Sequence, residues 1–90
     1  MPKKNEIGAA ICRYENGKLV YGPFSEGTHT RVDVKIACPK GSRFHGIFHT
    51  HPGGVAYPSD VDVASGKRVG AKVLCINSDT ERRCFNVDRL

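Results

Sequence analysis

Two histidines one residue apart, His49 and His51, are the side chains in this chain best suited to chemistry. Side chains alternate along a strand, so both imidazoles should lie on the same face. Residues 46–48, Gly-Ile-Phe, read as a short buried strand leading into the pair. A carboxylate brought back by the following loop, Asp62, would complete three ligands, the number that catalytic zinc sites take from the protein while leaving a fourth position to water. The spacing therefore predicts a metal site, with zinc as the metal.

The segment between the histidines and Asp62 carries local signals of its own. Residues 52–54, Pro-Gly-Gly, end the strand, and Ser59 is a good N-cap for a short helix over residues 60–69. Asp62 then occupies the third helical position, which is the acidic position of an S-x-x-D capping box. Ser59 and Asp62 could therefore do no more than start a helix. The metal-site interpretation rests on the joint spacing of H-x-H, seven residues and S-x-x-D.

A hydrolytic zinc site also needs a base that accepts a proton from the attacking water, and glutamate commonly does this. The candidates are Glu6, Glu15 and Glu26. Glu15 lies beside an Asn-Gly turn and is expected to be solvated. Glu26 has His29 three residues on, but its segment lacks a strand to aim it. Glu6 stands at the start of an apolar strand and is favoured as the base, although a frayed, charged terminus is the alternative interpretation.

The elements that must position these residues are predicted to be mainly strands. Asn16 and Gly17 favour a tight turn inside a hairpin, and residues 78–81 separate two strands that would close the sheet. Residues 24–30 read as a loop. The expected strands cover residues 6–14, 19–21, 31–37, 43–51, 72–77 and 82–87, with one short helix after the metal loop. This is an α+β arrangement, mainly β, with a sheet of five or six strands.

Length and composition set broad limits. Ninety residues allow one small domain, residues 1–90, and 39% hydrophobic with 26% charged residues fits a soluble globular fold. No apolar run approaches the ~20 residues of a membrane span, and no apolar signal-peptide core follows the N-terminus, so a cytoplasmic location is expected. The net charge of +5 is dispersed; it favours an acidic partner or serves as a solubilising surface. Nucleic acid is the less expected partner, because basic residues are not interleaved with aromatic ones.

The four cysteines form no C-x-x-C pair, so a cysteine zinc cluster is not expected. Cys75 and Cys84 would lie opposite each other in the closing hairpin, close enough to bridge in some registers. Reduced thiols are nevertheless the expectation, because intracellular cysteines usually stay reduced. His45 should share a strand face with His49, but four residues span about 13 Å of extended chain, which is too far for the same ion.

The chain resembles the JAMM (MPN-plus, JAB-like) metalloprotease family, whose signature is H-x-H-P, a spacer and S-x-x-D, with a glutamate upstream. The residues on signature positions are His49, His51, Pro52, Ser59 and Asp62, with Glu6-Ile7-Gly8 matching the upstream E-x-G. The related RadC family shares the spacing and a proline at the position of Pro58. The resemblance implies that His49, His51 and Asp62 bind zinc and that Glu6 is catalytic, moving the proton. It also implies that Ser59 is catalytic and donates a hydrogen bond to the developing oxyanion. The alternative is that Ser59 only caps the helix.

The resemblance also implies a fold and a function. The fold would be a curved MPN/JAB-like sheet with helix packed against it. The function would be that of a zinc-dependent peptidase or isopeptidase that cuts an amide in a protein or peptide, with the C-terminus of a ubiquitin-like or sulfur-carrier protein as one such substrate. The alternatives are a non-catalytic MPN-like assembly module with structural zinc and a RadC-like nucleic-acid-associated protein. Family members usually carry a helix before the glutamate strand, so one sheet face should lie uncovered here, which favours a homodimer or a partner protein.

Overall fold

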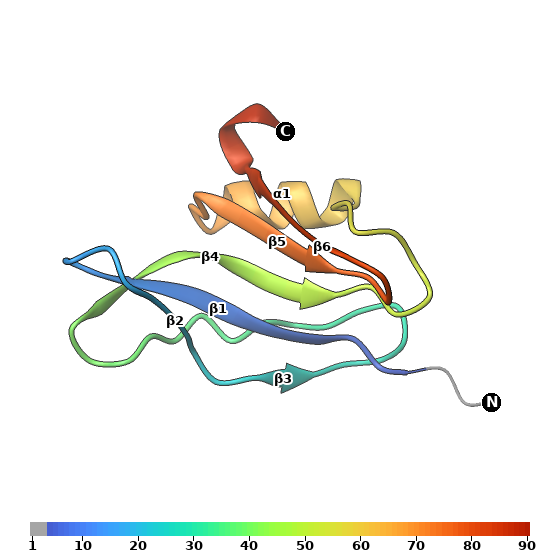
Figure 1. Cartoon of the computed structure of the whole chain (residues 1–90), viewed down its shortest axis with the longest axis horizontal. Coiled ribbons are helices and arrows are strands. Elements are labelled where there is room, and N and C mark those ends of the chain that lie inside the picture. The colour runs from blue at the N-terminus through green and yellow to red at the C-terminus, as the bar shows by residue number, and fades with distance from the viewer. Residues whose placement is uncertain (1–3) are drawn as a thin grey trace.

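The computed structural model describes residues 4–90, in which six strands form one mixed sheet (Figure 1). The strand order is β2-β1-β4-β5-β6, with β3 also paired to β1. Neighbouring strands are antiparallel except for the central pair β4 and β5, which run parallel. The elements are β1 (Ile7–Tyr14), β2 (Leu19–Tyr21), β3 (Ser25–Glu26), β4 (Ser42–Thr50), α1 (Asp60–Arg68), β5 (Val73–Asn77), β6 (Arg82–Asn86) and a final 3-10 turn, Val87–Arg89. The α+β prediction is confirmed.

Parallel pairing of β4 and β5 requires a crossover connection, and α1 supplies it. The helix packs against β5, and Gly66 allows the close approach: a Cβ there would lie 3.1 Å from Leu74 Cδ2. The core on this face contains Ile47, Ala71, Leu74 and Val87. Ile11, Phe48 and Cys75 form a second core cluster. In Figure 1, α1 lies on one side of the sheet, next to β5.

The segment of residues 31–37 is not a strand, so that prediction is wrong. Its alternation is real, because Val32 and Val34 are half-buried while their neighbours are exposed. However, β1 is already paired with β4 along one edge and with β2 and β3 along the other. The segment therefore crosses the sheet face, where Val34 packs on the α1-side core and both valines lie over Gly8.

The pairing of residues 25–28 with the start of β1 was also missed. Residues 25 and 26, expected within a loop, form β3 opposite Ile7 and Gly8. Two backbone hydrogen bonds extend this pairing: the Gly27 N–H donates to the Glu6 carbonyl (2.9 Å) and the Glu6 N–H to the Thr28 carbonyl (2.6 Å). The backbone of Glu6 is therefore fixed rather than frayed.

A β-bulge changes the position of His45. Gly46 pairs with Ile11 and Phe44 with Cys12, so His45 is an extra residue on β4. Phe44 consequently packs with the α1-side core, whereas His45 lines a hollow beside Cys75 on the opposite face. The prediction that His45 shares a face with His49 is wrong, because alternation does not survive a bulge.

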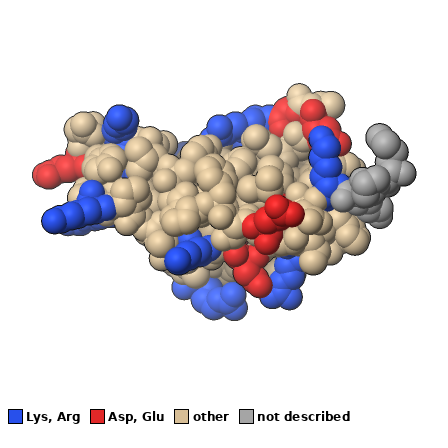
Figure 2. Space-filling view, turned by 90° about the horizontal axis from the view of Figure 1, so that it is seen from below, with Lys and Arg blue, Asp and Glu red and all other residues tan. Residues whose placement is uncertain are grey.

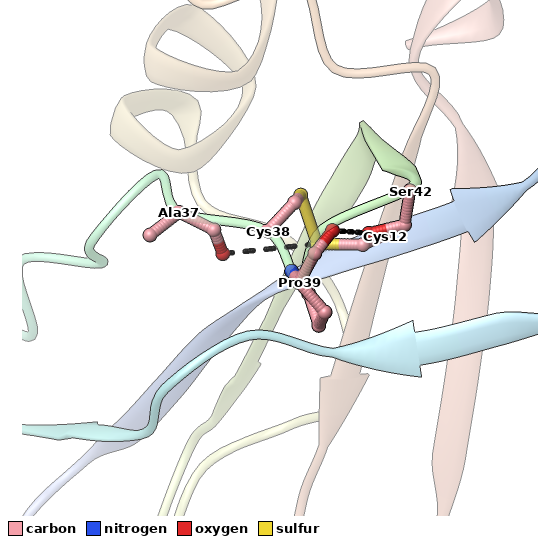
Figure 3. Close-up of a disulfide and its surroundings, with 5 residues drawn as sticks. All are labelled: Cys12, Ala37, Cys38, Pro39 and Ser42. Carbon is pink, nitrogen blue, oxygen red and sulfur yellow. Dashed lines mark hydrogen bonds between the residues drawn. A yellow bond between two sulfur atoms is a disulfide. The ribbon is translucent and has the colours of Figure 1, made fainter.

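The cysteines form two disulfides, Cys12–Cys38 and Cys75–Cys84, so the prediction of reduced thiols is wrong. The expected hairpin is present, and Cys75 pairs directly with Cys84, with their Cα atoms 4.0 Å apart. The Cys12–Cys38 bridge ties β1 to the turn before β4 (Figure 3), where the Ser42 hydroxyl donates to the Pro39 carbonyl at 2.7 Å.

The surface agrees with the dispersed charge expected from the sequence. Figure 2 shows one face, on which Lys and Arg side chains are spread around the margin with acidic groups among them and uncharged residues fill the middle. No helix in residues 4–90 is long and apolar enough to cross a membrane.

Candidate metal centre

His49 and His51 lie where β4 leaves the centre of the sheet. His49 is the penultimate residue of β4 and only 5% exposed, because β1 and β5 flank it on both sides. His51 follows the strand, and its N–H donates to the Asn77 carbonyl at 2.7 Å, so the β5 end holds it in line. Pro52 and Gly53 then turn the chain. Gly53 has φ +71°, a conformation that glycine adopts without steric cost.

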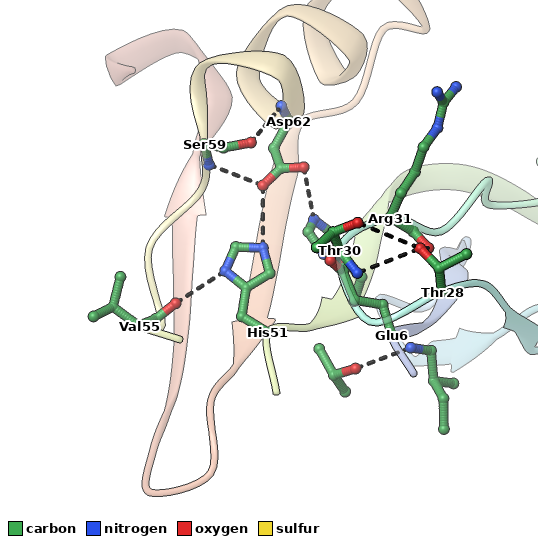
Figure 4. Close-up of polar contacts among 11 residues, drawn as sticks. Glu6, Thr28, Thr30, Arg31, His51, Val55, Ser59 and Asp62 are labelled. Atoms are coloured by element: carbon green, nitrogen blue, oxygen red, sulfur yellow. Dashed lines mark hydrogen bonds and ion pairs between the residues drawn. The ribbon is translucent and has the colours of Figure 1, made fainter. Parts of the chain in front are cut away.

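Asp62 reaches both imidazoles from the first turn of α1. Its Oδ1 lies 3.3 Å from His49 Nε2 and its Oδ2 lies 3.3 Å from His51 Nε2 (Figure 4). The same carboxylate completes the capping box, because the Ser59 N–H donates to Oδ2 at 2.8 Å and the Asp62 N–H donates to Ser59 Oγ at 3.2 Å. From the sequence, capping and the histidine contact were alternatives. In the structure Asp62 makes both contacts at once.

The hydrogen-bond partner of one ring nitrogen of His51 fixes which of its nitrogens is free. His51 Nδ1 lies 2.9 Å from the Val55 carbonyl, which can only accept, so Nδ1 carries the hydrogen and Nε2 is left with a lone pair. His49 Nδ1 is buried, lacks a hydrogen-bond partner and faces Glu6 Oε1 at 3.4 Å. Both Nε2 atoms thus point toward Asp62.

Glu6 is the candidate base that the fold brings to the site. It is 7% exposed and precedes β1, whose Gly8 pairs directly with His49. Glu26 is exposed, and its Oε2 accepts a hydrogen bond from the Asn5 amide at 2.8 Å. Glu15 is exposed beside the first hairpin turn. Of the three glutamates, only Glu6 contacts a histidine of the pair.

Two overlapping groups of donor atoms share the histidines. Atoms of Glu6, His49 and His51 all lie within 4.8 Å of one another, whereas Asp62 contacts both imidazoles from another direction. The two groups differ in which nitrogen of His49 they address: Glu6 faces Nδ1 and Asp62 faces Nε2. The geometry favours the group with Asp62, because its two oxygens contact the Nε2 atoms of both histidines.

The charges of the site stabilise each other. Burial alone would lower the pKa of His49, but contact with the Asp62 carboxylate and the charges of Asp62 and Glu6 raise that pKa above 6.5. Burial alone would raise the pKa of Asp62, but hydrogen bonds from His49 and Ser59 lower it from 3.8 to about 2. Asp62 is therefore fully ionised at neutral pH, as a metal-ligating carboxylate must be.

Ser59 is exposed at the helix N-terminus, and its oxygen accepts the Asp62 N–H. Because the oxygen accepts that bond, the hydroxyl hydrogen is free to donate, so capping the helix does not exclude a hydrogen bond to an oxyanion. Its role toward an oxyanion stays a prediction.

Sequence reasoning missed the residues that support the metal loop. The Val55 carbonyl orients His51, and the Gly53 N–H donates to Asp79 Oδ2 at 3.0 Å, which ties the loop to the turn between β5 and β6. Thr50 Oγ1 accepts the Ile7 N–H at 2.9 Å, which joins β4 to the start of β1. A backbone carbonyl carries no sequence signal, and Asp79 looks like an ordinary turn residue.

Comparisons with known proteins identify the family of the chain and agree with its fold. Residues 3–88 match the family described as prokaryotic homologs of the JAB domain. The fold is similar to the crystal structure of AF2198, a JAB1/MPN domain protein from Archaeoglobus fulgidus, with a TM-score of 0.60 and 22% identity over 92% of this chain and 71% of that one. A search of curated proteins gives no match. Because this family match covers nearly the whole length of the chain, the chain belongs to the prokaryotic JAB-domain family.

Proposed function

We propose that this domain is a zinc-dependent peptidase or isopeptidase of JAMM type. The observation that carries the proposal is the convergence of Asp62 on the Nε2 atoms of His49 and His51, with the buried Glu6 carboxylate beside His49. Two imidazoles and a carboxylate are a donor set that hydrolytic zinc sites use, so these residues fit the metal. When bound, zinc would polarise a carbonyl group and lower the pKa of water at its open position.

The roles of the chain's own residues follow from their placement. His49, His51 and Asp62 would hold the metal, and the Val55 carbonyl and Ser59 N–H would keep the His51 and Asp62 donors oriented. Glu6, the remaining buried carboxylate, would accept the proton of the attacking water and return it to the leaving amine. Ser59, at the exposed rim, would donate to the oxygen of the scissile amide as negative charge develops there.

The substrate side of the proposal is a protein or peptide amide. The extended C-terminal tail of a ubiquitin-like or sulfur-carrier protein is the form we favour, as the resemblance to the JAMM family implies. Zinc as the metal, cytoplasmic location and a homodimer or partner protein stay predictions from the sequence.

The test combines zinc content with hydrolysis for the wild type and two variants. His51→Ala removes a proposed ligand, so zinc and activity should both be lost. Glu6→Gln keeps the size of the side chain, so zinc should be retained while hydrolysis of an amide-linked tail substrate falls at least about 100-fold, the usual contribution of a general base. Glu26→Gln is the matched control and should change neither quantity. Full hydrolysis by Glu6→Gln would refute the assignment of the base.

A non-catalytic MPN-like module with structural zinc is the second candidate. One observation favours it: Glu6 faces the Nδ1 side of His49, where a carboxylate orients a metal-binding imidazole rather than serving water. In that case Glu6→Gln would weaken zinc binding roughly 10-fold or more, and the wild type would cleave no amide. Retained zinc affinity in Glu6→Gln excludes this candidate.

A further inference from the structure

We propose that Cys75–Cys84 is a redox-active disulfide, opened by a dithiol at the Cys84 sulfur, and that its state sets the affinity of the metal centre. The second half of the proposal rests on the proposed function, whereas the first half stands without it. The exposure of the two cysteines, their neighbours and their connections in the fold carry it.

The two cysteines differ in their exposure to solvent. Cys84 lies on β6, at the edge of the sheet, and is exposed, whereas Cys75 on the neighbouring β5 is only 4% exposed. A hollow of about 300 Å³ opens over the bridge, and its lining includes Tyr21, His45 and Arg82 as well as both cysteines. A thiol can therefore approach the bridge from the Cys84 side. In the other bridge Cys12 is fully buried and Cys38 is half-buried. Neither cysteine of that bridge is as exposed as Cys84.

Basic groups beside Cys84 favour attack by an anion. Arg82 lies two residues away on the same strand, and it is held by a 2.7 Å hydrogen bond to the Tyr21 hydroxyl and by its position over the Phe48 ring, 5.6 Å from the centroid. His45 lines the same hollow. The attacking species in disulfide exchange is the thiolate, and positive neighbours lower the pKa of a thiol and attract the thiolate.

The exchange balances with one dithiol as the reductant. A thiolate of the dithiol attacks Cys84 Sγ, the Sγ–Sγ bond breaks, and Cys75 leaves as a thiolate that takes a proton from solvent. The second thiol of the reductant, as thiolate, attacks the mixed disulfide and releases the Cys84 thiolate, which is protonated in turn. The dithiol ends as a disulfide and the two cysteines as thiols, a transfer of two electrons and two protons.

The hairpin closed by this bridge supports the metal loop. Cys75 pairs in register with Phe48, the residue before His49. Two residues beyond Cys75, the Asn77 carbonyl accepts the His51 N–H, and the following turn supplies Asp79 to the Gly53 N–H. In the described part of the chain β6 pairs with β5 alone, so opening the bridge loosens β6 and the Asp79 turn first. That motion reaches the segment carrying His51.

The test of reactivity does not require metal. The wild-type protein is treated with a small monothiol, trapped with iodoacetamide and mapped by mass spectrometry; the mixed disulfide should sit on Cys84, with Cys75 alkylated. In a dithiothreitol titration the Cys75–Cys84 bridge should open before Cys12–Cys38. A mixed disulfide on Cys75, or prior opening of Cys12–Cys38, would overturn the redox proposal.

The test of coupling compares zinc affinity in two double variants. Cys75→Ala with Cys84→Ala should bind zinc about fivefold more weakly than the wild type, a coupling of ordinary size. Cys12→Ala with Cys38→Ala, whose bridge joins β1 to the turn before β4, should bind zinc as the wild type does. Amide exchange at Gly53 in dithiol-reduced wild type gives the same information without a variant and should be faster than in the oxidised protein. Unchanged affinity and exchange would overturn the coupling. Should neither redox form bind zinc, the proposed function fails, and the trapping experiment still decides the redox proposal.

Discussion

Replacing Asp62 by asparagine tests whether one charge holds the site together. The amide would keep the size of the side chain and an oxygen that can still accept the Ser59 N–H, so the capping box would be largely preserved. What Asp62→Asn removes is the negative charge between His49 Nε2 and His51 Nε2, each 3.3 Å from a carboxylate oxygen. The expected loss of stability can be worked out from the pKa of Asp62.

The pKa of Asp62 falls from 3.8 to about 2 on folding, and its side chain is 19% exposed. A lowered carboxyl pKa means stability that is present above the unfolded value and is lost as the pH falls through the folded value, here between about 4 and 2. At 1.36 kcal/mol for each pKa unit, the ionised carboxylate contributes about 2 kcal/mol at neutral pH. For a chain of this size that corresponds to a fall in the melting temperature of roughly 10 °C.

The assay is thermal unfolding in a chelator at neutral pH, so that zinc affinity does not enter the comparison. Asp62→Ala serves as the second variant, because it also removes the side-chain oxygen that accepts the Ser59 N–H and should cost about 1 kcal/mol more. In Asp62→Asn the pKa of His49, measured by NMR, should fall below its wild-type value, because the contact that raises it is gone. A melting temperature within about 2 °C of the wild type, with an unchanged His49 pKa, would refute the reasoning.

Three further predictions concern other parts of the structure. Because the pKa of His49 is raised on folding, the stability that this residue contributes in the absence of zinc is complete below pH 6.5 and is lost as the pH rises through the raised pKa. The melting temperature in chelator should therefore fall between about pH 6 and about pH 9. Over the same range the increase in melting temperature produced by zinc should grow, since zinc requires neutral imidazole. Gly46→Ala would place a Cβ 2.4 Å from both the Val73 carbonyl oxygen and Val73 Cγ2, so urea unfolding should show a loss of roughly 3 kcal/mol, whereas an unchanged midpoint would contradict the β4–β5 packing. Asp79→Ala should weaken zinc binding several-fold by calorimetry with little change in stability, because it removes only the anchor of Gly53; a wild-type affinity would show that the loop needs no such anchor.

The parts of the fold that local signals specify were predicted well. The Asn16-Gly17 turn, the Ser59 cap and the closing hairpin each depend on a few neighbouring residues, and each is present. What failed depends on contacts distant in sequence. Residues 31–37 alternate as a strand does, but both edges of β1, the strand that they lie over, are already paired, and occupancy of an edge is a property of the whole sheet.

The candidate site shows the same division. The joining of His49, His51 and Asp62 was predicted from spacing, and Glu6 was favoured among three glutamates and is the one that contacts a histidine of the pair. The position of Cys84 opposite Cys75 was predicted too. Reduced thiols were nevertheless expected, because cysteines of intracellular proteins usually stay reduced. The bulge at His45 escaped prediction because the partner strand, rather than the residue, defines it.

That bulge has a consequence for how faithfully the molecule folds. Glu6 precedes β1 and His49 lies on β4, so a slip of one residue between these strands would turn Glu6 to the opposite face from His49. A pair of regular strands would tolerate such a slip at modest cost, because every offset gives the same pattern of backbone hydrogen bonds. An extra residue in one strand accepts the partner at only one offset, because any other leaves the bulge facing a regular stretch. The bulge at His45 thus fixes the register of β1 and β4 and keeps Glu6 on the same face as His49.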